Sequence, residues 1–191
     1  MRIISGSHKS RLLKPPLGLP VRPTTDLAKE SLFNILNNYI DFEDVKVLDL
    51  FAGTGNVSFE FASRGATLVV GIETNTKCVD FISKTATELK FQNLSVIKAD
   101  AFVYLSRQSV EYDVIFADPP YDMPEREKVV KMVLENNWLS DEGWFVLEHD
   151  KYLNFAGHPL LYDERRYGKV HFSFFRKSPP EAEGQEDQIE I

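Results

Sequence analysis

Apolar residues along the chain fall into two alternating patterns. Five short runs rich in branched residues are typical of strands buried on both faces: 46–51, 68–72, 94–97, 113–117 and 144–147. Apolar residues recur at helical spacing in stretches between these runs, and this predicts helices at 57–62, 79–89 and 125–135. Strands that alternate with helices in this way indicate an α/β fold with a mostly parallel sheet and helices on both faces.

Extended segments near both ends of the chain complete this picture. Residues 160–167 and 169–176 alternate around Gly168, which predicts two antiparallel strands and brings the sheet to seven strands. Residues 2–4 and 11–13 are short extended pieces with turn-forming residues between them. We therefore expect a small N-terminal β-hairpin that stands off the main sheet.

Cap and turn residues set the remaining boundaries. Thr24 or Thr25 is suited to cap a helix that runs to about residue 40, and a turn is expected at 140–143. From residue 178 the chain is acidic and has few apolar residues, which is typical of disorder. We expect three parts: an arm at 1–22, one α/β domain at 23–177 and a disordered acidic tail at 178–191.

Charge and composition narrow the possible partners. A net charge of −7 argues against a nucleic-acid partner, yet residues 1–25 contain five basic residues and no acid. The arm therefore offers a possible phosphate-binding face. The single cysteine excludes an internal disulfide and suits a reducing cytoplasm. No apolar run reaches the length of a membrane helix, and the four histidines lack metal-ligand spacing, so we expect neither a membrane nor a metal.

The stretch 46–58 carries the first chemical signal. A buried strand contains Asp49, and Gly53 and Gly55 then allow a tight turn before a helix, the arrangement with which many α/β domains bind nucleotides. The dinucleotide pattern has glycine or alanine where this chain has Ser58, and the Asp49 carboxylate would repel a pyrophosphate. S-adenosylmethionine fits better, because it carries a sulfonium, an ammonium and no phosphate. Glycines that only permit a turn remain the alternative.

Two further acids follow strands of the same sheet. Glu73 comes 24 residues after Asp49, where this fold places an acid that accepts a hydrogen bond from a ribose hydroxyl. Asp100 and Ala101 follow the strand at 94–97, where an acid can meet an adenine amino group. Both positions are consistent with an adenosine-containing ligand.

The strand at 113–117 ends in the tetrapeptide Asp118-Pro119-Pro120-Tyr121. The first and fourth strands should be neighbours at the switch point of the sheet, so this tetrapeptide is expected to open beside the glycine turn. Two prolines remove two N–H donors, which leaves the carboxylate and backbone carbonyls as acceptors for a planar NH₂ group. The tyrosine offers a ring on which a base can stack, a contact of about 1–3 kcal/mol.

This set of acceptors suggests a reaction. Two acceptors that hold the hydrogens of a base amine pull its nitrogen toward a pyramidal shape and aim the lone pair at the sulfonium methyl. Transfer is then an in-line displacement driven by positioning and electrostatics. A base in a duplex has to be flipped out for this, whereas a base in an RNA loop can already be exposed.

These motifs resemble class I S-adenosylmethionine-dependent methyltransferases that methylate amino groups. Residues 1–6, 22–26 and 29–36, which read MRIISG, RPTTD and KESLFNIL, are similar to the opening of the bacterial RsmD family. That family methylates N2 of one guanine in small-subunit 16S ribosomal RNA, and the resemblance covers residues 1 to about 176. It implies ribosomal RNA or an assembly intermediate of the small subunit as the partner. We expect a cytoplasmic monomer.

The resemblance also implies roles for individual residues. At the cofactor it places Asp49, Ala52, Gly53, Gly55, Asn56, Glu73, Asp100, Ala101 and Asp118. In catalysis it places Asp118, Pro119 and Tyr121. At the RNA substrate it places Arg2, Lys9, Arg11, Arg22, Thr24, Pro120 and Tyr121. The chain departs from the family at Ser5 and Ser10, where glycine is usual, and at Leu27, where arginine is common; this affects the RNA site more than the chemistry.

Three other functions remain open. An adenine-N6 methyltransferase acting on DNA or RNA has the same tetrapeptide chemistry, although the chain shows no separate domain for reading DNA. A non-catalytic, S-adenosylmethionine-binding RNA assembly factor is disfavoured by the intact Asp118 and Tyr121. A nicotinamide dehydrogenase is disfavoured by Asp49 and Ser58.

Overall fold

The structure, a computed structural model, describes residues 1–19, 26–107 and 110–177. Its helices and strands, in chain order, are α1 (Asp26–Leu36), the 3₁₀ helix η1 (Phe42–Asp44), β1 (Lys46–Leu50), α2 (Asn56–Ser63), β2 (Leu68–Glu73), α3 (Thr76–Glu88), β3 (Leu94–Lys98), α4 (Ala101–Leu105), β4 (Tyr112–Ala117), α5 (Glu127–Glu135), β5 (Leu139–His149), β6 (Leu161–Tyr167) and β7 (Val170–Arg176).

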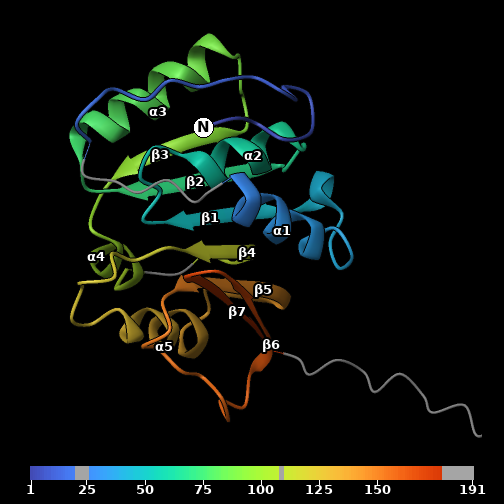
Figure 1. Ribbon diagram of the computed structural model, residues 1–191, viewed down its shortest axis with the longest axis vertical. Helices are drawn as coiled ribbons and strands as arrows, with labels where there is room; N and C mark the ends of the chain where they lie inside the picture. The colour runs from blue at the N-terminus through green and yellow to red at the C-terminus, as the bar shows by residue number, and fades with distance from the viewer. Residues whose placement is uncertain (20–25, 108–109, 178–191) are drawn as a thin grey trace, which may run out of the picture.

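The strands form a seven-stranded sheet in the order β3-β2-β1-β4-β5-β7-β6, and Figure 1 shows them stacked in this order from the top of the view. The strands from β3 to β5 are parallel to their neighbours, whereas β7 is antiparallel to both β5 and β6. The predicted α/β fold with a mostly parallel sheet is confirmed. The chain order reverses between β1 and β4, and α/β proteins of this kind bind ligands at such a switch point.

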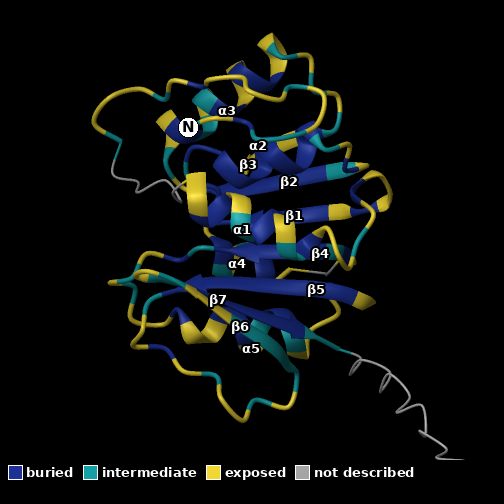
Figure 2. Ribbon diagram, turned by 45° about the vertical axis from the view of Figure 1, so that its right-hand side comes forward, coloured by how far each residue is buried: buried dark blue, intermediate teal, exposed yellow. Residues whose placement is uncertain are grey.

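Helices cover both faces of the sheet. One apolar layer contains Leu32 of α1, Phe59 of α2 and Ile82 of α3, and the other contains Leu105 of α4 and Val129 of α5. Figure 2 shows the central strands dark blue, and therefore buried, between these layers. This double burial explains why the strands read as apolar runs in the sequence.

The N-terminal arm forms a short antiparallel pairing instead of a regular β-hairpin. Its two extended pieces pair antiparallel through a bridge between Arg2 and Leu12, and the backbone N–H groups of Ile3 and Leu13 donate to the carbonyl oxygens of Arg11 and Met1, both at 2.9 Å. Neither piece extends into a strand. The arm also does not stand off the domain, because Ile3 and Leu13 are buried in the layer formed by α1, α2 and α3.

Contacts with α2 explain this difference. The backbone N–H of Ser7 donates to the carbonyl oxygen of Ser63 at 2.7 Å, and the Ser63 hydroxyl donates to the carbonyl oxygen of Ser5 at 2.7 Å. Gly6 lies between these two contacts with a φ of +81°. The turn between the two pieces of the arm is thus hydrogen-bonded to α2, which holds the arm against the domain.

Three features of the secondary structure differ from the prediction. Helix α1 ends at Leu36 instead of about residue 40, and its predicted caps Thr24 and Thr25 lie outside the described residues. The turn predicted at 140–143 is wrong, because these residues form an irregularity inside β5 that the Ser140 hydroxyl ties to Asp113 at 3.0 Å. Helix α4 was not predicted. The tail at 178–191 lies outside the described residues.

The packing of the arm predicts unequal effects of two glycine substitutions. Gly6 and Gly18 both have left-handed backbone, with φ of +81° and +77°. A Cβ at Gly6 would lie 1.8 Å from the Ser63 carbonyl oxygen, whereas one at Gly18 meets nothing within 4 Å. We expect Gly18→Ala to lower the melting temperature by a few degrees, about 2–4 °C per kcal/mol for a chain of this size. Gly6→Ala should lower it further and make the arm sensitive to protease, and equal losses in the two variants would contradict the packing.

Candidate active site

Pairing within the sheet brings the two predicted loops to one rim. Leu50 of β1 pairs with Ala117 of β4, and Ala117 pairs with Leu147 of β5. The residues that follow, Phe51 and Asp118, therefore start side by side at the carboxyl ends of neighbouring strands. The expectation that the glycine turn and the Asp118 loop share one rim is confirmed.

The turn after β1 has an unusual backbone. Phe51, Gly53 and Gly55 have positive φ angles of 64°, 55° and 76°. A Cβ at Gly55 would lie 2.9 Å from Ile82 and 3.0 Å from Phe59, so this position requires glycine for space as well as conformation. A phenylalanine with positive φ is strained by about 1–2 kcal/mol, and strain of this kind is concentrated at functional sites.

Asp49 lies beneath this turn and is buried. Its carboxylate accepts a hydrogen bond from the hydroxyl of Ser58 on α2. Burial raises the pKa of Asp49 to about 7, and the hydrogen bond from Ser58 opposes the rise. The carboxylate therefore lies in a site where a nearby positive charge would stabilise its ionised form.

Glu73 connects the end of β2 to the turn. One of its carboxylate oxygens accepts the backbone N–H of Gly53 at 2.8 Å, and the other accepts the backbone N–H of Asn75 at 2.7 Å. Asp100 follows β3 and caps α4 by accepting the backbone N–H of Val103 at 3.0 Å. Glu73 is thus held against the glycine turn, while Asp100 is exposed further along the same rim.

The residues of the loop after β4 differ in their exposure to solvent. Pro119 is buried, Pro120 is exposed, and Asp118 and Tyr121 are half-buried. Burial, followed by the charges of Glu148 and Asp49, raises the pKa of Asp118 well above its ordinary value. Burial is also the largest cause that raises the pKa of Tyr121, so its phenol stays neutral. The loop therefore combines a proton-accepting carboxylate with an uncharged ring.

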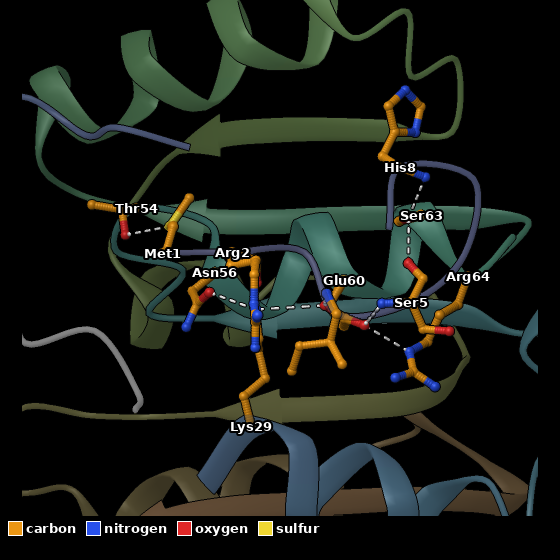
Figure 3. A network of polar contacts seen from close by, with 11 residues as sticks. Met1, Arg2, Ser5, His8, Lys29, Thr54, Asn56, Glu60, Ser63 and Arg64 are labelled. Atoms are coloured by element: carbon orange, nitrogen blue, oxygen red, sulfur yellow. Dashed lines mark hydrogen bonds and ion pairs between the residues drawn. The ribbon is translucent and has the colours of Figure 1, made fainter. Parts of the chain in front are cut away.

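The residues predicted to bind RNA are only partly described. Arg2, Lys9 and Arg11 are exposed on the arm, whereas Arg22 and Thr24 lie outside the described residues. Figure 3 shows that the start of the arm lies close to the glycine turn, where the Thr54 hydroxyl lies 3.4 Å from the sulfur of Met1. The arm and the turn are therefore neighbours in space.

Two features are absent from the described residues. No group of three or more His, Cys, Asp or Glu side chains among residues 1–19, 26–107 and 110–177 is arranged to hold a metal ion. Within the same ranges, the helices are too short or too polar to cross a lipid bilayer.

Comparison with known proteins identifies the family. The model of a family described as "Conserved hypothetical protein 95" matches residues 1–176. The chain belongs to this family. Among its relatives, "Ribosomal RNA small subunit methyltransferase D" of Escherichia coli K12 is 30% identical over 190 residues, which covers 98% of this chain and 93% of the relative. "Putative rRNA methyltransferase YlbH" of Bacillus subtilis is 31% identical over 184 residues, covering 93% and 99%. The resemblance to the RsmD family is thus confirmed.

Solved structures agree with this assignment. A structure described as "Putative methyltransferase yhhF from Escherichia coli" has a TM-score of 0.81 and 29% identity, and the match covers 94% of this chain and 98% of that one. The Thermus thermophilus "16S rRNA N2 G1207 methyltransferase (RsmC) in complex with AdoMet and Guanosine" has a TM-score of 0.67 at 22% identity, with coverage of 84% and 46%. The second likeness shows the shared class I methyltransferase fold.

Sequence reasoning missed three residues at the rim. In the sequence Ser58 stands out only as a departure from the dinucleotide pattern, whereas in the structure its hydroxyl donates to Asp49. Arg126 donates to the carbonyl oxygen of Tyr121 at 2.7 Å and pairs with Asp150 at 3.1 Å, which holds the Asp118 loop in place. Glu148 follows Leu147 at the end of β5 and raises the pKa of Asp118. Only Glu148 had a usable signal, an acid directly after an apolar strand.

The raised pKa of Asp49 predicts how stability depends on pH. The folded protein keeps a proton on Asp49 up to pH about 7, whereas the unfolded chain releases it near pH 4, so this group lowers stability as pH rises between these values. Asp49→Asn should remove this pH-dependent loss of folding stability, which is roughly 4 kcal/mol at most. Melting temperatures of variant and wild type should therefore diverge as pH rises, with the variant higher.

The exposed Asp44, at the opposite end of β1, provides the matched control. Asp44→Asn should follow the wild type at every pH. Parallel melting curves for Asp49→Asn and the wild type would contradict the assigned pKa.

Proposed function

We propose that the protein transfers a methyl group from S-adenosylmethionine to the N2 amine of a guanine in 16S ribosomal RNA of the small subunit. The observation that carries this proposal is the pairing of Leu50 with Ala117, which opens the glycine turn and the Asp118 loop at one rim. Membership of the RsmD family and relatives named as ribosomal RNA methyltransferases support the RNA substrate.

The groups around the glycine turn fit this cofactor. The buried Asp49 suits a cation and disfavours a phosphate, because burial already resists its ionisation. Oε2 of Glu73 accepts the Gly53 N–H and keeps a lone pair for a ribose hydroxyl, whereas Oε1 accepts both the Asn75 N–H and the Thr74 hydroxyl. Asp100 and Ala101 follow β3 on the side where the adenine would lie. When bound, S-adenosylmethionine supplies an electrophilic methyl group on its sulfonium.

The Asp118 loop holds the base amine. Pro119 and Pro120 have no N–H groups, so the Asp118 carboxylate and the loop carbonyls act as acceptors for the two amine hydrogens. The nitrogen gains a methyl group and loses one proton. The raised pKa of Asp118 makes its carboxylate a better proton acceptor than an ordinary aspartate. Tyr121, held by Arg126 through its carbonyl oxygen, supplies the ring on which guanine stacks.

An adenine-N6 methyltransferase remains the second candidate, since the same acceptors fit the amine of adenine. An incubation experiment separates the two candidates. Purified protein is mixed with labelled S-adenosylmethionine and with small subunits or naked ribosomal RNA from a strain lacking the enzyme. We expect labelled N2-methylguanosine in nucleoside digests. Labelled N6-methyladenosine would reject the guanine assignment, and cofactor binding without any transfer would favour a non-catalytic assembly factor.

Asp118→Ala tests the assigned acceptor. We expect a fall in kcat of at least about 100-fold, because the variant loses both an amine acceptor and the proton acceptor. Cofactor affinity should be largely kept and should fall far less than kcat even though Asp118 is expected near the cofactor, which an equilibrium titration with S-adenosylhomocysteine can measure. Asp44→Asn is the control and should keep full activity. Turnover that survives in Asp118→Ala would refute the role of this carboxylate.

The basic arm predicts a salt-dependent effect on RNA binding. Lys9 and Arg11 are exposed, and two phosphate contacts on single-stranded RNA account for about 1.4 units of the slope of log affinity against log salt. We expect Lys9→Ala with Arg11→Ala to weaken RNA binding and to reduce the slope by about this amount. Lys131→Ala removes an exposed charge from α5 and serves as the control. An unchanged slope in the double variant would place the RNA elsewhere.

A further inference from the structure

Lys29 is a buried cation at the junction of three segments. Its side chain is 1% exposed, and its ammonium lies 2.6 Å from the carbonyl oxygen of Arg2, 2.9 Å from Oδ1 of Asn56 and 3.5 Å from Oε2 of Glu60 (Figure 3). An ammonium has three N–H donors, which matches these three oxygens. The arm, α1 and the first turn of α2 therefore meet at one group.

The start of α2 connects this junction to the glycine turn. Asn56 is the first residue of α2 and directly follows Gly55. A second contact between the arm and the turn joins Thr54 to Met1 at 3.4 Å. A movement of the arm relative to Lys29 would therefore shift the residues proposed to hold the cofactor.

Glu60 anchors the arm to the same helix. Its fully buried carboxylate accepts the backbone N–H groups of Ile4 at 2.7 Å and Ser5 at 3.0 Å. Arg64 forms a second ion pair with it at 2.9 Å. Figure 3 shows Arg64 on the side of Glu60 away from Asn56, so the two cations that neutralise Glu60 face different segments.

Stability alone is a weak reason for a buried lysine. Burial lowers the pKa of Lys29, and the charge of Glu60 is the main opposing influence. Apolar residues of similar volume generally stabilise a core at least as well as a buried ion pair. An apolar side chain cannot, however, hold the Arg2 carbonyl and the Asn56 amide at fixed distances from one point. The specific contribution of Lys29 is therefore the placement of the arm relative to the glycine turn.

On the basis of the proposed function, we propose that Lys29 is a positioning residue that keeps the RNA-binding arm docked against the cofactor-binding turn before either ligand arrives. The arm has a docked and a released arrangement, and both ligands bind the docked one more tightly. The apparent dissociation constant of each ligand equals its intrinsic value divided by the docked fraction. With Lys29 present this fraction is close to one, so neither ligand has to order the arm.

This role predicts cooperativity that the wild type lacks. In Lys29→Met the docked fraction falls, so the affinities for S-adenosylhomocysteine and for a 16S ribosomal RNA transcript should each fall by about fivefold or more. Saturating transcript should then restore most of the lost S-adenosylhomocysteine affinity, because RNA selects the docked arm. In the wild type the transcript should change that affinity by less than about twofold. Calorimetric titrations with and without transcript measure all four values.

Arg64→Met is the matched control. It also removes a cation from Glu60, but it leaves the contacts of Lys29 with Arg2 and Asn56 in place. We expect it to lower the melting temperature without creating cooperativity between the two ligands. The same cooperativity in Arg64→Met would show that loss of buried charge is sufficient, and this would overturn the specific role of Lys29.

A second variant keeps the proposal testable if Lys29→Met does not fold. Lys29→Met with Glu60→Gln removes both charges and leaves an amide oxygen that can accept an arm N–H, and it should show the same cooperativity. Wild-type affinities in either folded variant, or lost affinity that the transcript does not restore, would overturn the proposal. A wild-type protein that binds neither S-adenosylhomocysteine nor the transcript would instead reject the proposed function itself.

Discussion

The rest of the structure depends on one constraint. Carboxyl groups at the rim of the sheet are partly removed from water, and this opposes their ionisation. Asp49 lies near the end of β1 and Asp118 follows the adjacent parallel strand β4, and burial is the largest cause that raises the pKa of each carboxyl group. The partner that the structure gives Asp49 is the neutral hydroxyl of Ser58 instead of a cation. Such a site is unfavourable for the empty protein and favourable for a ligand that brings positive charge, so stability and binding oppose each other here.

The surrounding fold compensates for this unfavourable rim. Both faces of the central strands are covered by apolar layers, so the strand ends are fixed whatever the charge state of the acids. Arg126 holds the Asp118 loop from outside through the carbonyl oxygen of Tyr121 and the carboxylate of Asp150. The acceptor groups of the proposed base site are thus already in place, which is the condition under which positioning lowers a reaction barrier.

The sequence was sufficient for features that follow from strand periodicity. The apolar run around Asp49 and the one before Asp118 predict parallel strands, and the ends of neighbouring parallel strands necessarily share a rim. Features that depend on side chains from distant segments could not be predicted from the sequence. The irregularity in β5 looked like a turn because its tie, from Ser140 to Asp113, spans 27 residues. The arm was expected to stand off the domain because nothing local indicates that Ser63 forms a hydrogen bond with it.

Helix α1 shows most clearly where local pattern and structure disagree. Leu27 is 71% exposed, whereas Lys29, two residues later, is 1% exposed, so the usual distribution of apolar and charged residues is reversed at the start of the helix. Glu60, which explains the buried lysine, lies 31 residues further along the chain. A sequence that breaks the binary pattern in this way loses local consistency, and natural proteins retain such breaks mainly at functional sites. The reversal lies where the arm, α1 and the glycine turn meet, which is the junction between the proposed RNA site and the proposed cofactor site.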